Sequence, residues 1–136
     1  MALAPSIAKA LLYEVWRLKM RWTQLGSYGE KLAVDYVRGI KYDVLSRNYR
    51  CNLGEIDIIA MDAKTLVFIE VKTRSSLRYG SGLESVNYKK QRRIRKVATS
   101  YLNKNRVTFS QIRFDVIDIL VKKDAPIQID HIKNAF

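Results

Sequence analysis

Charged residues stand within a stretch that otherwise has the pattern of a hydrophobic β-hairpin. Residues 54–72 read GEIDIIAMDAKTLVFIEVK, two β-prone runs separated by a polar turn candidate at 62–65. If the turn has an even number of residues, Asp57 faces Glu70 across the hairpin and Glu55 faces Lys72. Two carboxylates directly opposite each other are destabilising unless a cation lies between them. Their hard oxygen atoms suit Mg²⁺ or Mn²⁺, which take few carboxylates from a protein.

Lys72 lies beyond Glu70 on the same face of the expected strand, because side chains alternate between the two faces. Its ammonium group would hold a metal-activated water or a phosphate oxygen. On spacing alone, an edge strand with a surface ion pair is the more common explanation, because many strands contain Glu-x-Lys. The residues around the hairpin favour a metal site over a surface ion pair.

Motifs on both sides of the hairpin extend the pattern. The order Asp, a dozen residues, then Glu-x-Lys resembles the active site of the PD-(D/E)xK nuclease superfamily. From about Gly26 onwards the chain is similar to the bacterial YraN-type family, a group of predicted nucleases that resemble archaeal Holliday-junction resolvases. The segments that carry the resemblance are Gly29-Glu30, Arg47-Asn48-Tyr49-Arg50, Gly54-Glu55-Ile56-Asp57, Phe68-Ile69-Glu70-Val71-Lys72-Thr73-Arg74, Lys90-Gln91, Arg113-Phe114-Asp115-Val116 and His131-Ile132 to Phe136.

The resemblance implies a site and an activity. Asp57, Glu70 and the Val71 carbonyl would ligate Mg²⁺ or Mn²⁺. Glu30 would add a ligand through water, and Lys72 would orient the attacking water. The implied activity is metal-dependent hydrolysis of phosphodiester bonds in DNA, with branched DNA as a candidate substrate. The alternatives are a catalytically inactive nucleic-acid-binding protein with a nuclease fold and, third, an adaptor that docks through an N-terminal helix.

Glu30 has a competing structural role. Helical spacing predicts a helix from about Ser27 to Gly39, with Glu30 at the edge of its apolar stripe. Ser27-Tyr28-Gly29-Glu30 also fits a capping box, in which Glu30 bonds back to the Ser27 amide. The two roles exclude each other in one rotamer, so the sequence leaves both open.

Composition narrows the partners. Lysine and arginine number 25 against 13 acidic residues, which gives a net charge of +12 and favours polyanions, nucleic acid first and anionic membrane second. The single cysteine, Cys51, excludes an internal disulfide, and the single histidine, His131, excludes a histidine-rich zinc site. Any metal must therefore be held by carboxylates. No stretch reaches the roughly 20 apolar residues that span a bilayer and no secretory signal is recognisable, so we expect a cytoplasmic protein.

Cationic side chains predict where nucleic acid binds. Arg47 and Arg50 end the first expected strand, and Arg74 and Arg78 lie in a polar loop after the hairpin. A helix over 85–102 carries a run of cations without interspersed acids, which favours phosphate binding over a merely solvated face. These cations are Lys89, Lys90, Arg92, Arg93, Arg95 and Lys96. By resemblance, Lys90-Gln91 also matches the position at which resolvase-like relatives complete the active site.

The expected elements form a three-layer α/β domain. An amphipathic basic helix within residues 1–25 would cap the domain, or dock on a partner or a membrane surface. Residues 26–136 would form the nuclease-like domain, with helices over 27–39 and 85–102 and strands over 42–49, within 54–72 and over 112–121, and a tail packed on the core.

A right-handed crossover through the second helix would make the last strand parallel to the strand that carries Glu70. The order αβββαβ with a mixed sheet is that of the restriction-endonuclease-like core. A homodimer would match a substrate with two-fold symmetry.

Overall fold

The computed structural model describes residues 7–8, 11, 22–75, 86–122 and 125–136 of the chain. Its elements are α2 Trp22–Gly39, β1 Asp43–Cys51, β2 Gly54–Asp62, β3 Thr65–Arg74, α3 Tyr88–Lys104, β4 Gln111–Leu120 and β5 Gln128–Ile132. Most of the expected N-terminal helix, and Arg78 of the expected loop, lie outside the described residues. Among the described helices, none is long and apolar enough to cross a bilayer.

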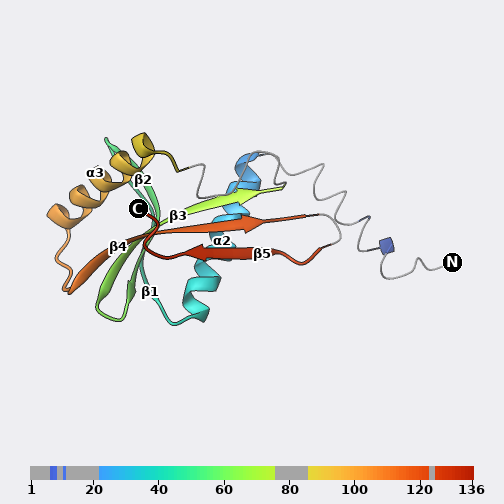
Figure 1. Ribbon diagram of the computed structural model, residues 1–136, viewed down its shortest axis with the longest axis horizontal. Coiled ribbons are helices and arrows are strands. Elements are labelled where there is room, and N and C mark those ends of the chain that lie inside the picture. Colours follow the sequence, from blue (N-terminus) through green and yellow to red (C-terminus); the bar gives the residue numbers. More distant parts are fainter. Residues whose placement is uncertain (1–6, 9–10, 12–21, 76–85, 123–124) are drawn as a thin grey trace.

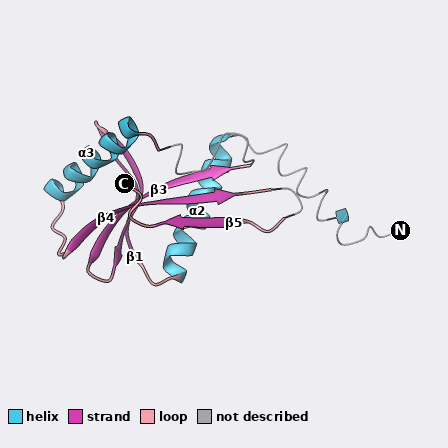
Figure 2. Ribbon diagram, in the orientation of Figure 1, coloured by secondary structure: helices cyan, strands magenta, loops and turns pink. Residues whose placement is uncertain are grey.

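The strands form one five-stranded sheet in chain order, β1-β2-β3-β4-β5 (Figure 2). The first three strands pair antiparallel, β3 pairs parallel with β4 as the crossover argument predicts, and β5 pairs antiparallel with β4. The sheet is therefore mixed, and its order with one helix before it and one between β3 and β4 is that of a restriction-endonuclease-like fold.

Helices α2 and α3 cover opposite faces of the sheet, so the described part of the chain has three layers (Figure 1). Ala33, Val34 and Val37 of α2 pack in one hydrophobic cluster, which includes Ile58, Ile69 and Ile117 of the sheet. The apolar stripe of α3 packs in the other, as its spacing predicts; its buried members are Ile94, Val97, Ala98 and Tyr101. Each helix thus buries one side and leaves its charged side exposed.

The central hairpin has the predicted register. Met61 lies opposite Leu66 and Ile59 opposite Phe68, around a turn at 63–64. The ladder stops at Ile58 opposite Ile69, so neither predicted pair beyond it, Asp57 with Glu70 or Glu55 with Lys72, belongs to the ladder. Glu55 instead pairs with Arg50 of β1. β2 therefore leaves β3 at the point where the charged residues begin.

The C-terminal tail packs on the core as expected, but it also forms an edge strand that was not predicted. His131 of β5 places Nε2 2.7 Å from Asp115 Oδ2, and its Nδ1 lies 3.2 Å from the Tyr36 hydroxyl. Arg113 Nε and the Asn134 amide also donate to the Asp115 carboxylate. Burial alone would raise the pKa of Asp115, but these hydrogen bonds outweigh it and lower the pKa. Side-chain bonding thus supports a strand whose own residues are largely exposed.

Candidate functional site

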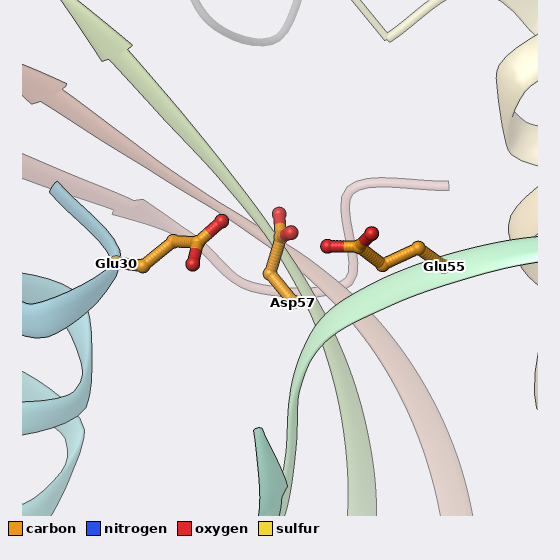
Figure 3. A group of neighbouring side chains, drawn as sticks. All are labelled: Glu30, Glu55 and Asp57. Atoms are coloured by element: carbon orange, nitrogen blue, oxygen red, sulfur yellow. The ribbon is translucent and has the colours of Figure 1, made fainter. Parts of the chain in front are cut away.

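Three carboxylates from two elements converge beside the hairpin. Glu30 of α2 and Glu55 and Asp57 of β2 each offer an oxygen atom, and these atoms all lie within 4.8 Å of one another. Figure 3 shows the three side chains pointing toward a common centre. Glu30 and Asp57 were predicted as site residues, whereas Glu55 was not. The sequence could have indicated Glu55, because it lies two residues before Asp57 and side chains two residues apart on a strand lie on the same face.

A close approach of α2 to β3 places Glu30. A Cβ atom on Gly29 would lie 1.7 Å from Thr73 Oγ1, so only glycine permits this contact. The helix begins at Trp22, which puts Ser27 inside it rather than at its N-terminus. The capping-box interpretation of Glu30 is therefore wrong, and the carboxylate is available to the cluster. Burial, followed by repulsion from Glu55, raises the pKa of Glu30.

Asp57 lies where β2 separates from β3. Its Oδ2 accepts a hydrogen bond from the Val71 N–H at 2.8 Å, in place of a backbone carbonyl. On the other side of β2, the β1–β2 ladder skips the position of Asn48, whose φ of 52° lies in the left-handed region. Asparagine tolerates this conformation better than most residues. The register of the β1–β2 ladder shifts only between Val44 and Ser46 and is the same on both sides of Asn48. The interruption at Asp57 is therefore the end of the β2–β3 ladder at Ile58 and Ile69.

The Asp57 carboxylate carries an unfavourable charge in the absence of a cation. Burial, followed by repulsion from Glu70, raises the pKa of Asp57 to about 8. Glu30 and Glu55 raise it further. A hydrogen-bonded carboxylate that resists ionisation among three others is a group that a bound cation would stabilise.

Glu70 is not one of the three converging carboxylates, and it forms ion pairs with two lysines. Its Oε1 lies 2.7 Å from Lys90 Nζ of α3 and 3.5 Å from Lys72 Nζ on its own strand. The Glu70 side chain is 9% exposed. Burial, followed by the neighbouring Lys90, lowers the pKa of Lys72. Direct coordination of a cation by Glu70 and by the Val71 carbonyl stays a prediction.

A cavity of about 580 Å³ opens beside the carboxylates. Cations and carboxylates line it together; the lining residues are Arg50, Cys51, Gly54, Glu55, Asp57, Glu70, Lys90, Arg93 and Ile94. Arg50 is 75% exposed in its side chain and pairs with Glu55 at 2.8 Å. The mixture of guanidinium, ammonium and carboxylate groups suits a phosphodiester with a metal ion beside it.

The other predicted nucleic-acid contacts divide into exposed and engaged side chains. Arg47, Lys89 and Arg92 are exposed. Arg74 donates to both oxygens of Asp118, at 3.0 and 2.6 Å, and its side chain is 16% exposed. Gln91 Nε2 donates to the Val86 carbonyl near the start of α3. Arg74 and Gln91 therefore have structural partners, and their contact with nucleic acid stays a prediction.

The three converging carboxylates lie within the part of the chain that matches the sequence model of a protein family. The sequence model of the uncharacterised protein family UPF0102 matches residues 29–119, from Gly29 beside the site to Ile119 near the end of β4. A UPF0102 protein of Geobacter metallireducens is 52% identical over 112 residues, which cover 82% of this chain and 91% of the relative. One from Clostridium botulinum is 46% identical over 114 residues, covering 82% and 93%. One from Caldicellulosiruptor saccharolyticus is 41% identical over 118 residues, covering 86% and 100%.

Proposed function

The chain belongs to the uncharacterised protein family UPF0102, the YraN-type family, and from the site it carries we propose a nuclease that hydrolyses DNA with a bound divalent cation. The convergence of Glu30, Glu55 and Asp57 within 4.8 Å, beside a cavity lined by cations, supports this proposal most directly. Nucleic acid is the polyanion that a chain of net charge +12 favours. Branched DNA is the substrate that the resemblance to junction resolvases suggests.

The donor set fits Mg²⁺ or Mn²⁺. All three converging ligands are carboxylate oxygens, which hard divalent cations prefer, and soft ligands such as thiolates are better suited to other metals. Glu30, Glu55 and Asp57 would hold the ion. The Val71 N–H donates to Asp57, and Glu70 lies close enough to Asp57 to raise its pKa by repulsion. When bound, such an ion activates water and stabilises negative charge on phosphate.

The chain's own cations would orient the substrate. Arg50 and Arg93 line the cavity and would bind phosphates on either side of the bond to be cleaved. Lys72 lies 3.5 Å from Glu70 at the edge of the site and would donate to a phosphate oxygen or to the attacking water. Such fixed positive charge is usually the largest contribution to catalysis of this kind.

Comparing Asp57→Ala with Asp43→Ala in a cleavage assay tests the proposal. Asp43 is an exposed carboxylate on β1, so its removal changes the net charge equally. On branched and linear DNA with Mg²⁺ or Mn²⁺, Asp57→Ala should cleave about 100-fold more slowly or worse, because it loses a cation ligand. DNA binding should persist, and Asp43→Ala should cleave at the wild-type rate. Cleavage by Asp57→Ala at the wild-type rate would show that the assignment is wrong.

A binding protein without turnover is the second candidate. The ion pairs of Glu70 with Lys72 and Lys90 favour it, because they engage the carboxylate that the motif predicts as a ligand. Thermal melts with and without Mn²⁺ separate the two candidates. An inert site predicts salt-sensitive DNA binding but no rise in Tm with the cation.

A further inference from the structure

Four carboxylates gather at this site, and Glu70 is neutralised by the chain itself. Glu30, Glu55 and Asp57 converge, while Glu70 lies close enough to raise the pKa of Asp57 by repulsion. The nearest cation to Glu70 is Lys90 Nζ at 2.7 Å, a hydrogen-bonded contact shorter than the 3.5 Å to Lys72. Lys90 is therefore its principal partner.

The first turn of α3 fixes the Lys90 backbone. The Asn87 side chain caps the helix by accepting the Lys90 N–H at 2.9 Å. Gln91 Nε2 donates to the Val86 carbonyl at 3.0 Å, and Val86 is buried in the core. The ammonium group thus comes from a capped and anchored helix end, on a different element from the strand that carries Glu70. Such a contact is positioned by the fold rather than by a freely moving surface side chain.

From this geometry we infer that the Lys90 ammonium group takes the place of a second divalent cation at Glu70, so that the site binds one divalent cation per chain. The inference rests on the proposed function, because it assumes that Glu30, Glu55 and Asp57 hold the first ion. Lys90 is a positioning residue in this account: it holds Glu70 beside the ion and away from coordinating another one.

Charge balance supports a single ion. The four carboxylates carry four negative charges when ionised, and Lys72 and Lys90 supply two positive charges beside Glu70. One divalent cation completes the neutralisation. A second would leave an excess of two positive charges in a partly buried site, against one in a variant that lacks Lys90. Arg50 alters this little, since its side chain is 75% exposed and its charge is screened by water.

Counting bound Mn²⁺ by isothermal titration and by electron paramagnetic resonance tests the inference without any cleavage assay. The wild type should bind one Mn²⁺ per chain. Lys90→Met leaves Glu70 without its principal partner and should bind two. The double variant Lys90→Met with Glu70→Gln should return to one. Lys89→Met, which removes an exposed neighbouring charge, should bind one like the wild type.

Each outcome bears on a different proposal. Two ions in the wild type, or one ion in a folded Lys90→Met variant, would overturn the inference while leaving the proposed function intact. Binding of no ion by the wild type would overturn both. Lys90→Gln serves the same purpose if Lys90→Met does not fold, and Lys90→Arg should retain the single ion because it keeps the positive charge.

Discussion

Burial, hydrogen bonding and neighbouring charges shift the pKa of Asp57 in different directions. The Val71 N–H stabilises its ionised form, while burial and the neighbouring carboxylates raise its pKa to about 8. Burial, followed by repulsion from Glu70, Glu30 and Glu55, outweighs this hydrogen bond. This imbalance makes the stability of the metal-free protein depend on pH.

In the presence of a chelator, stability should fall as pH rises from about 4 to about 8. The pKa of Asp57 is about 8 in the folded protein and near the ordinary value of about 3.9 in the unfolded chain. The folded state therefore holds a proton that the unfolded chain has released, and this stabilisation is lost as pH rises through the folded pKa. Thermal melts from pH 5 to 8.5 should show a larger fall in Tm for the wild type than for Asp57→Asn. Equal slopes would contradict the effect of Asp57.

Glu55→Gln tests the candidate ligand that the sequence motif did not include. Removing one of three converging carboxylates should weaken Mn²⁺ binding about tenfold or more, because a neutral amide is a poorer ligand for a hard cation. Asp35→Asn is the control, since Asp35 is exposed on α2 and its change removes the same charge. Titration calorimetry measures both variants. Equal Mn²⁺ affinities would exclude Glu55 as a ligand.

Residue types and spacing identified Asp57, Glu70 and Lys72 as site candidates, and the family resemblance added Glu30. The structure groups Glu30 and Asp57 with Glu55, and it pairs Glu70 with lysines. The sequence analysis assumed that the hairpin register continues past Ile58, which placed Glu55 opposite Lys72. It therefore did not predict that Glu55 lies close to Asp57. Sequence periodicity does not predict that the β2–β3 ladder ends at Ile58 and Ile69. The ion pair of Lys90 with Glu70 depends on the placement of α3 against the sheet, which the charge run alone did not specify.

At the scale of elements, the contact of α2 with β3 decides whether Glu30 reaches the site. Gly29→Ala should destabilise the fold by about 1–3 kcal/mol and weaken Mn²⁺ binding, because the new Cβ would overlap Thr73. Gly26→Ala is the matched control: no atom lies within 4 Å of its added Cβ, and alanine in a helix is worth about 1 kcal/mol over glycine. Urea unfolding should move the two variants in opposite directions. A stable Gly29→Ala variant with unchanged Mn²⁺ affinity would show that Glu30 does not depend on this contact.

The elements with strong periodicity were predicted, and those that rely on tertiary contacts were not. The hairpin, the crossover helix and β4 followed from alternation and apolar stripes. β5 carries little apolar pattern of its own and depends on the buried contact of His131 with Asp115, residues sixteen positions apart. The early start of α2 at Trp22 was also missed, because Ser27 offered a plausible N-cap.

At the scale of the whole molecule, the net charge of +12 predicts salt-dependent affinity for DNA. On duplex DNA the log–log slope with salt is about −0.9 per phosphate neutralised. Replacing Lys89 and Arg92 of α3 together by alanine should reduce the magnitude of the slope by about one to two. The pair Lys31 and Arg38 on α2 is the control, exposed and equal in charge. Fluorescence anisotropy at several salt concentrations measures the slope, and equal slopes for both double variants would argue against α3 as the binding surface.

The bond between the Val71 amide and Asp57 gives the site a spectroscopic reporter. A cation coordinated by the Asp57 oxygens would weaken the hydrogen bond that Asp57 accepts from the Val71 N–H. The nitrogen-15 chemical shift of Val71 should therefore change during a titration with diamagnetic Mg²⁺. The hydrogen–deuterium exchange rate of the Val71 amide should change as well, while the rates of the other amides in the β3–β4 ladder should stay the same. A silent Val71 resonance during saturable ion uptake would mean that the ion binds away from Asp57.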